Sequence, residues 1–88
     1  MIAVYGFYYD GNCIYIGSSK DVKHRYIKHK SNCYNKNCDK YYYPFYKYIR
    51  ENTTFDNLTF MIYQECDKNE LLNFERKYIE LLKPNCNK

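Results

Sequence analysis

Residues 2–17, IAVYGFYYDGNCIYIG, decide the fold of this chain. Two runs of β-forming residues, 2–9 and 12–17, flank the dipeptide Asp10-Gly11. Asp-Gly between two such runs is typical of a tight hairpin turn, because glycine adopts a left-handed backbone conformation at little cost. The stretch therefore predicts a β-hairpin at the start of the domain.

The pairing register of this hairpin decides which side chains share a face. If Asp10-Gly11 forms a two-residue turn, Tyr5 lies opposite Ile16, and Tyr5 and Tyr15 point to opposite faces. If the loop has three residues, Tyr5 lies directly opposite Tyr15. We favour the three-residue loop because it separates aliphatic from mainly aromatic side chains: Ile2, Val4, Ile14 and Ile16 on one face, and Tyr5, Phe7, Cys13 and Tyr15 on the other.

A chain of 88 residues suits a single domain, which we place at residues 1–88. No apolar run approaches the 18 residues of a membrane-spanning helix, and the first residues lack the charged start, apolar block and cleavage site of a signal peptide. We therefore expect an intracellular protein, in the cytoplasm or nucleus, that is neither secreted nor bound to a membrane.

The five cysteines are expected to be reduced thiols, because their number is odd and no secretory signal is found. A structural zinc site needs four well-spaced ligands. Cys33 and Cys38 with His24 or His29 upstream match no familiar zinc spacing. A small zinc-stabilised binding protein is therefore the less favoured alternative.

The charge and aromatic content suit a nucleic-acid ligand. The net charge is +4, and the chain has 13 tyrosines and five phenylalanines. Such a surface attracts phosphates and stacks on bases. An A/T-rich coding sequence would also produce this composition, so the composition alone leaves both explanations open.

The residues after the hairpin predict two helices and a loop. Ser18 or Ser19 can cap a helix that begins near Asp21, an early acid that suits the positive end of the helix dipole. A loop rich in asparagine and lysine follows over residues 31–40. A proline at the first position predicts a second helix over residues 44–51.

The last third of the chain predicts a strand and a helix. Residues 57–66 alternate like a third strand, with Leu58, Phe60 and Ile62 on one face. Asp67, with an acid three positions later, resembles a capping box that opens a last helix, which ends before Pro84. The predicted element order is β-β-α-α-β-α.

Glu75 lies on the wrong side of its predicted helix. On a helical wheel it falls inside the apolar arc, 40° from Leu71 and 60° from Tyr78. A buried carboxylate needs a cation, strong hydrogen bonds or a metal ion to offset its desolvation. Two explanations stay open. The carboxylate forms a salt bridge to a core-facing arginine or binds a capped backbone group, or it is a hard oxygen ligand for Mg²⁺.

Arg25 and His29 share or border the apolar side of the first predicted helix, beside Val22 and Tyr26. Taken alone, such a histidine is more often a satisfied core residue than a catalytic one. Together with Glu75 and the hairpin tyrosines, these residues suggest an active site.

The sequence resembles the GIY-YIG nuclease domain family. Tyr15-Ile16-Gly17 matches the second family tripeptide, and Ala3-Val4-Tyr5 stands where Gly-Ile-Tyr is expected. The family also has an arginine, often a histidine one turn later, and a glutamate on a later helix. The matching residues here, with the closing proline and asparagine, are Arg25, His29, Glu75, Pro84 and Asn85 or Asn87.

The resemblance implies an α+β fold, a small three-stranded antiparallel sheet flanked by helices, which agrees with the predicted element order. It implies a metal-dependent DNA endonuclease that leaves 5′-phosphate and 3′-hydroxyl ends. The expected cofactor is a divalent ion, Mg²⁺ with Mn²⁺ as the alternative, and the expected substrate is duplex or branched DNA. Specificity is expected to come from an accessory DNA-binding partner or from oligomerisation.

The resemblance also implies roles for single residues. Glu75 binds the metal, and Arg25 stabilises charge on the phosphate. Tyr5 is the candidate general base, with its pKa lowered by nearby cations, and Tyr15 orients the water or phosphate. His29 either receives the proton from Tyr5 or positions that tyrosine.

The remaining candidate residues are expected either to have a structural role or to bind DNA. Gly17 and Asn85 are motif residues with a structural role, and Ser18, Lys23 and Lys40 are candidate DNA contacts. An alternative is a binding module of the same fold that has lost catalysis, because the first tripeptide is degenerate.

Overall fold

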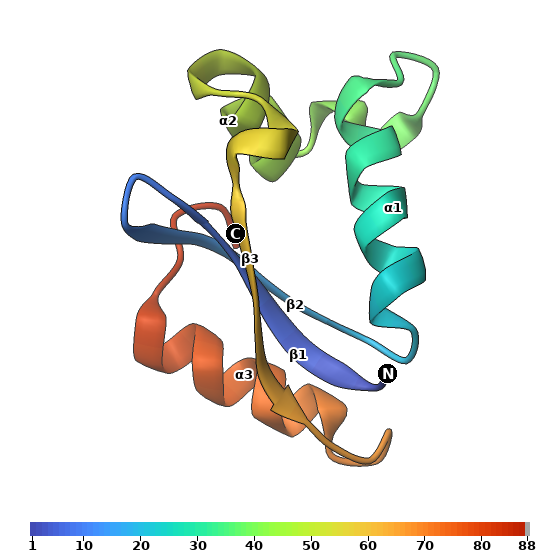
Figure 1. The fold of residues 1–88 in the computed structure, drawn as a ribbon, viewed down its shortest axis with the longest axis vertical. Coiled ribbons are helices and arrows are strands. Elements are labelled where there is room, and N and C mark those ends of the chain that lie inside the picture. The colour runs from blue at the N-terminus through green and yellow to red at the C-terminus, as the bar shows by residue number, and fades with distance from the viewer. Residues whose placement is uncertain (88) are drawn as a thin grey trace.

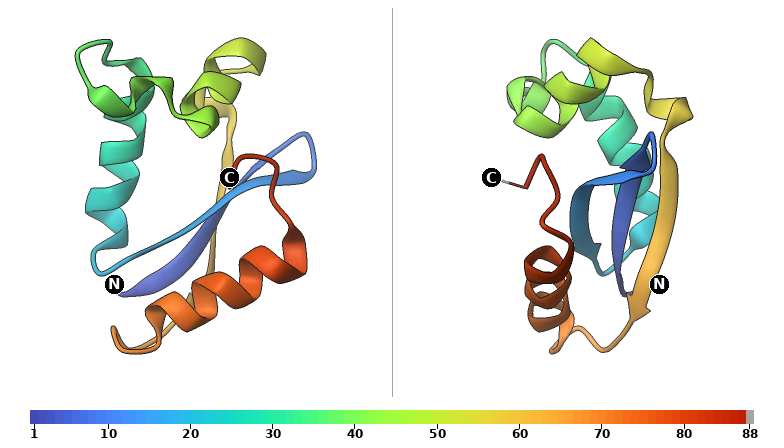
Figure 2. Two further views of the ribbon diagram at one scale, coloured as in Figure 1. Left: turned by 180° about the vertical axis from the view of Figure 1, so that it is seen from behind. Right: turned by 90° about the vertical axis from the view of Figure 1, so that its left-hand side faces the viewer.

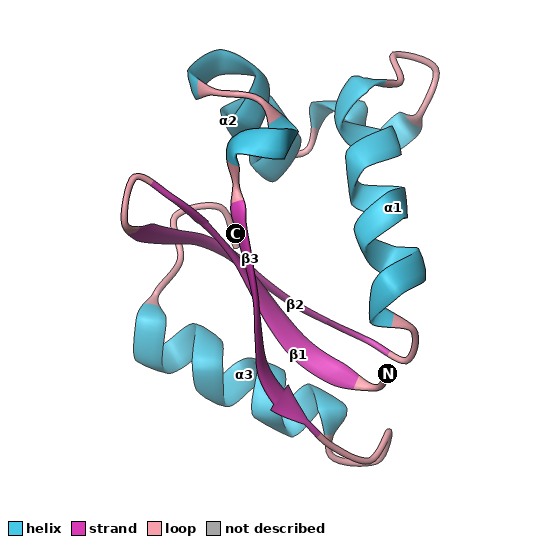
Figure 3. Cartoon of the chain, viewed as in Figure 1, coloured by secondary structure: helices cyan, strands magenta, loops and turns pink. Residues whose placement is uncertain are grey.

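A computed structural model describes residues 1–87. In chain order the larger elements are the following: β1 (Ala3–Tyr9), β2 (Asn12–Ser19), α1 (Val22–Tyr34), α2 (Pro44–Asn52), β3 (Thr59–Glu65) and α3 (Leu71–Leu82). Short 3₁₀ turns, Asp39–Tyr42 and Phe55–Asn57, precede α2 and β3. The predicted order β-β-α-α-β-α and the α+β class are confirmed (Figures 1 and 3).

The three strands form one antiparallel sheet in the order β2-β1-β3, so the first strand is central. A cluster of buried side chains on one face of the sheet joins α1 and α2 to β1. A smaller cluster, built on Val4, Ile16 and Leu71, packs α3 against the other face. The two views of Figure 2 show α3 apart from α1 and α2. No helix within residues 1–87 is long and apolar enough to cross a bilayer.

The hairpin register differs from the one that we favoured. Asp10 and Gly11 have φ of 52° and 78° and form a two-residue turn. A β-bulge lies between the pairs Phe7–Tyr15 and Tyr8–Cys13, with Ile14 as the extra residue, and beyond it Tyr5 lies opposite Gly17. The three-residue loop was therefore wrong.

The bulge nevertheless keeps the two motif tyrosines together. Phe7 lies opposite Tyr15, and residues two apart on a strand share a face, so Tyr5 and Tyr15 share one as well. The bulge also puts two residues of β2 on the faces opposite to those that we expected. Ile14 packs in the cluster of Tyr5, and Cys13 packs in the cluster on the other face of the sheet. A plain two-residue hairpin would have separated the tyrosines.

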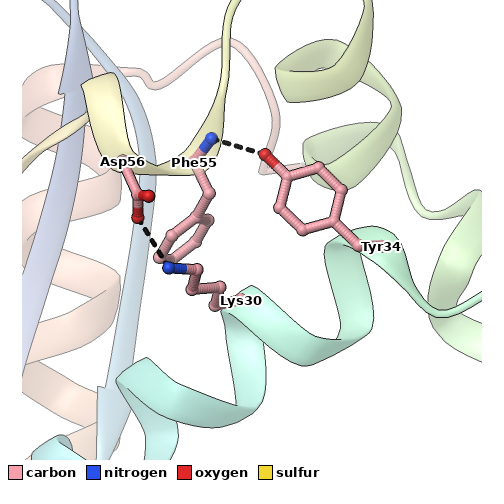
Figure 4. A network of polar contacts seen from close by, with 4 residues as sticks. All are labelled: Lys30, Tyr34, Phe55 and Asp56. Atoms are coloured by element: carbon pink, nitrogen blue, oxygen red, sulfur yellow. Dashed lines mark hydrogen bonds and ion pairs between the residues drawn. The ribbon is translucent and has the colours of Figure 1, made fainter.

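Helix α1 begins at Val22, close to the predicted start near Asp21, but its cap and its end differ from the prediction. Its N-cap is Asp21, whose carboxylate accepts a hydrogen bond from the His24 backbone N–H at 3.2 Å. The helix continues to Tyr34, four residues beyond the predicted limit. Its last turns are held against the turn that precedes β3, by a Lys30–Asp56 ion pair and a hydrogen bond from the Phe55 backbone N–H to the Tyr34 hydroxyl (Figure 4).

Helix α3 lacks the predicted capping box. Its N-cap is Glu70, and no side chain accepts a hydrogen bond at that cap. The helix ends at Leu82 because Lys83 adopts the left-handed conformation, with φ of 47°, directly before Pro84. The chain is thereby turned back toward β2.

The C-terminal segment closes the outer edge of β2. The Cys86 backbone N–H donates to the Ile14 carbonyl at 2.9 Å. The Asn87 side chain accepts from the Ile16 N–H at 2.7 Å and donates to the Ile16 carbonyl at 2.6 Å. An edge strand with satisfied backbone groups is protected from pairing with another chain. Of the two candidate closing asparagines, Asn87 therefore holds β2, while Asn85 is exposed.

The main cluster is organised around the Phe7 ring, which is fully buried. Six rings from β1, α1, α2, β3 and the turn before β3 lie within 6.0 Å of its centroid: Tyr5, Tyr26, His29, Phe45, Phe55 and Phe60. Packing around one side chain therefore aligns the helices with the sheet.

We expect Phe7→Ala to leave the domain largely unfolded at 25 °C, because a buried phenylalanine-to-alanine change costs roughly 3–5 kcal/mol and a domain of this size has about that much stability. Phe7→Leu, which keeps most of the volume, should remain folded with a smaller loss. Chemical denaturation followed by circular dichroism measures both. Tyr42→Ala, at a 74% exposed tyrosine, is the matched control; a loss at Phe7 no larger than at Tyr42 would contradict the packing role.

Candidate active site

Tyr5 lies across the backbone of the neighbouring strand. A Cβ atom built on Gly17 would stand 2.6 Å from the Tyr5 hydroxyl and 3.0 Å from the Tyr15 ring. Real Cβ atoms do not approach other atoms so closely, so any larger residue at position 17 would displace Tyr5. Gly17 of the second tripeptide therefore provides the space in which the two tyrosines meet.

His29 joins β1 to α2 through both of its ring nitrogens. The Tyr5 hydroxyl lies 2.7 Å from Nε2, and the Tyr46 hydroxyl lies 2.7 Å from Nδ1. All three side chains are buried. A neutral imidazole has one N–H and one acceptor nitrogen, so one of these tyrosines donates to the ring and the other accepts from it.

The hydroxyl of Tyr46 has a further partner. Asn32 on α1 donates a hydrogen bond to it at 3.4 Å, and Cys38 donates to the Asn32 amide oxygen at 3.4 Å. Sequence reasoning missed Tyr46. A wheel over α2 would have indicated it, because Tyr46 lies on the buried side with Phe45 and Ile49, and a buried tyrosine hydroxyl requires a polar partner.

Burial controls the titration of this cluster. Burial, with the Arg25 and Lys40 charges adding to it, lowers the pKa of His29 to about 3, so the ring is neutral at physiological pH. Burial raises the pKa of Tyr15 to about 12, which the nearby Tyr46 and Glu75 favour and Arg25 opposes. Burial also raises the pKa of Tyr5, and the neighbouring Tyr15 adds to this.

The expected lowering of the Tyr5 pKa is therefore wrong. The Arg25 guanidinium does favour the charged phenolate, but the loss of water around the Tyr5 hydroxyl is the larger effect. The residue in contact with that hydroxyl is a neutral histidine with a ring nitrogen at hydrogen-bond distance. Tyr5 is therefore protonated at physiological pH, and its hydroxyl lies at hydrogen-bond distance from Nε2 of His29.

Arg25 reaches the same cluster from α1. Its charge acts on Tyr5, Tyr15, His29 and Tyr46. Its Nε atom is buried and has no hydrogen-bond partner among residues 1–87. A buried N–H donor without a partner costs about 1–3 kcal/mol and favours the binding of an anion. Arg25 is thus suited to a phosphate oxygen.

Glu75 approaches from the other face of the sheet, on α3. The Ser18 hydroxyl donates to its Oε1 at 2.7 Å, which fixes the carboxylate beside the end of β2. Within the described residues no hydrogen bond to Oε2 is found. Glu75 also acts electrostatically on Tyr15, which places it near the tyrosine cluster. Ser18 thus positions Glu75, and its predicted contact with DNA stays a prediction.

The carboxylate fits a hard divalent cation. Mg²⁺ is commonly held by one or two carboxylates together with waters and substrate phosphates. No group of three metal-ligating histidine, cysteine or acidic side chains occurs within residues 1–87. Glu75 is the carboxylate that, like Arg25, acts electrostatically on Tyr15, and Ser18 contacts only one of its oxygens. The arrangement suits a cation that takes its other ligands from water and substrate.

The two predicted lysine contacts differ in position. Lys40, in the turn before α2, is partly buried and close enough to lower the pKa of His29. Lys23 is exposed on α1 and lines an apolar hollow with Met1 and Ile62, at the β3 side of the helix. The structure therefore brings Lys40, but not Lys23, to the tyrosine cluster.

The fold resembles that of known nuclease domains. Two solved structures of the N-terminal GIY-YIG endonuclease domain of UvrC from Thermotoga maritima align with 99% of this chain and 82% of their own, at TM-score 0.61 and 23% and 24% identity. Both are tyrosine-to-phenylalanine point mutants bound to a catalytic divalent cation. A search among curated proteins found no significant match.

Among protein-family models, the GIY-YIG catalytic domain matches residues 1–88, which is the whole chain. The match agrees with the intact Tyr15-Ile16-Gly17 tripeptide and with the space that Gly17 leaves for Tyr5. This chain belongs to the GIY-YIG catalytic domain family.

Proposed function

We propose that this chain is a DNA endonuclease that hydrolyses a phosphodiester bond with a divalent cation, Mg²⁺ or Mn²⁺, and leaves 5′-phosphate and 3′-hydroxyl ends. The observation that carries the proposal is the convergence of Arg25 and Glu75, from opposite faces of the sheet, on the tyrosine cluster beside Gly17. An anion-binding donor and a cation-binding carboxylate on either side of polar hydroxyls suit a phosphate.

Arg25 and Glu75 have complementary tasks in this mechanism. The guanidinium of Arg25, with its unpartnered Nε, binds a non-bridging phosphate oxygen and stabilises the charge that grows as phosphorus becomes five-coordinate. Glu75, held by Ser18, binds the cation. A cation held there would supply charge neutralisation at the phosphate and at the leaving 3′ oxygen.

Tyr5 and His29 form the base. The Tyr5 hydroxyl transfers its proton to Nε2 of His29 as the phenolic oxygen takes a proton from the attacking water. The imidazolium that forms donates to Tyr46 from its other nitrogen, which is already 2.7 Å away. Asn32 holds the Tyr46 hydroxyl and with it the ring orientation. Tyr15 orients the water or the phosphate by hydrogen bonding.

The substrate is proposed to be duplex or branched DNA. The positive net charge supports phosphate binding without sequence selection. Specificity would come from a partner module or from oligomerisation, since phosphate contacts alone do not identify a sequence. The buried Cys33 thiol and the partly buried Cys38 thiol suit a reducing compartment, so we place the activity inside the cell.

Glu75→Gln should abolish Mg²⁺-dependent nicking of supercoiled plasmid, because the amide loses the charge that binds the cation but still accepts from Ser18. Gel assays with Mg²⁺, with Mn²⁺ and with chelator measure this. Glu80→Gln, at an exposed carboxylate of the same helix, is the matched control and should cut normally. Unchanged cleavage by Glu75→Gln overturns the metal role; no cleavage by the wild type supports an inactive binding module.

Tyr5→Phe and Arg25→Ala should each lower kcat by at least about 100-fold, since general-base and electrostatic groups contribute about that much, without a matching loss of DNA affinity. Single-turnover cleavage and equilibrium binding in Ca²⁺ separate the two quantities. Tyr26→Phe, at a partly buried tyrosine of the same cluster, is the control for removing a hydroxyl. A loss confined to affinity would contradict the catalytic roles.

The neutral His29 predicts that the domain loses stability in mild acid. In the unfolded chain His29 gains a proton near pH 6.5, whereas in the folded protein it gains one only near pH 3. Because the unfolded state binds more protons between these values, a fall in pH favours unfolding. From pH 7 to pH 5 the free energy of unfolding should fall by about 2 kcal/mol. Urea denaturation at several pH values measures this, and His29→Gln should show a correspondingly flatter profile. Equal slopes for the two proteins would contradict it.

A further inference from the structure

A crevice opens beside Tyr15, between the start of α2 and the end of α3. Its volume is about 530 Å³, and Tyr43, Pro44 and Phe45 line one wall. Ile79 and the C-terminal segment with Asn87 line the other. Because Tyr15 belongs both to this crevice and to the tyrosine cluster, the crevice is continuous with the proposed site of phosphate cleavage.

The α2 side of the crevice is aromatic, as is Tyr15. The rings of Tyr15 and Phe45 stack with centroids 4.2 Å apart and 12° between their planes. Tyr43, at the N-cap of α2, is 52% exposed, and its ring is nearly parallel to that of Tyr46. An exposed tyrosine beside stacked rings offers a face to another planar ring. A nucleobase is such a ring, and base–aromatic stacking is worth about 1–3 kcal/mol.

The position of the crevice limits which base can enter. Ile79, which lines the crevice, lies one helical turn after Glu75 on the same face of α3. Arg25 and Glu75 both act on Tyr15. A phosphate bound near Tyr15 by these two residues would have its attached nucleotide close to the crevice, which Tyr15 also lines. The Arg25 and Lys40 charges near His29 suit the adjoining DNA backbone.

We propose that this crevice binds the unstacked base of the nucleotide next to the scissile phosphate, with Tyr43 as its stacking platform. This inference rests on the proposed nuclease function and specifies its substrate class. A base inside a continuous duplex must leave its stack to enter, at a cost of a few kcal/mol, whereas an unpaired base at a flap, bubble or branch enters without that cost. DNA with an unpaired nucleotide at the cleavage position is therefore the preferred substrate.

The first test detects base binding without cleavage. 2-Aminopurine is placed at each position around the junction of a 5′-flap oligonucleotide, and its fluorescence is measured as the Glu75→Gln variant binds. Stacking on an aromatic ring should quench the probe at one position near the junction. Quenching should be lost in Tyr43→Ala/Glu75→Gln and kept in Tyr43→Phe/Glu75→Gln. Tyr42→Ala/Glu75→Gln, at a neighbouring exposed tyrosine outside the crevice, is the control.

The second test measures cleavage. Tyr43→Ala should lower kcat/KM on the flap substrate by about tenfold or more, and should have no effect when the base at the quenched position is replaced by an abasic analogue. An equal loss on both substrates, or equal cleavage of the flap and the continuous duplex by the wild type, overturns the proposal. So does quenching that persists in Tyr43→Ala/Glu75→Gln.

Two other outcomes have separate meanings. If the wild type cuts no DNA in Mg²⁺ or Mn²⁺, the nuclease proposal fails, while the fluorescence test still decides whether the crevice holds a base. If Tyr43→Ala changes the oligomeric state measured by light scattering without DNA, the crevice binds a second copy of the chain, which also overturns the proposal.

Discussion

The Tyr5 side chain can occupy its place only because position 17 has no Cβ. Two strands of a hairpin bring residue pairs within a few ångströms, and an ordinary side chain opposite Tyr5 would fill the space that the phenol ring takes. The ring instead lies across bare backbone and directs its hydroxyl toward α1. The hydrogen bond to His29, and through it the position of Tyr46, depend on this arrangement.

The hydrogen-bonded series of Tyr5, His29 and Tyr46 connects the candidate active site to the hydrophobic core. Phe7, two residues from Tyr5, packs against His29 and Phe45, so the same aromatic cluster that stabilises the fold excludes water from the hydrogen-bonded chain. Exclusion of water keeps the histidine neutral and the tyrosines protonated. It also makes each hydrogen bond more costly to lose, which favours a single arrangement of the three side chains.

Helices on both faces of a thin sheet provide the opposite charges of the site. Arg25 comes from the face covered by α1 and α2, and Glu75 from the face covered by α3. The Ser18 hydrogen bond holds Glu75 beside β2, and the Asn87 side chain holds the outer edge of the same strand. Because β2 is an edge strand of the sheet, side chains from both faces can approach it.

The sequence by itself determined the element order and indicated Tyr5, Tyr15, Arg25, His29 and Glu75 as candidate site residues. Alternation and turn chemistry are local, so the strands, the Asp10-Gly11 turn and the helices could be predicted within a few residues. The inward position of Glu75 followed from helical periodicity alone. The tertiary structure decided what depends on distant partners. The bulge after Phe7 set the hairpin register, burial reversed the expected pKa shift of Tyr5, and packing of α2 on α1 brought Tyr46 to His29, because desolvation and long-range contacts have no local signal in the chain.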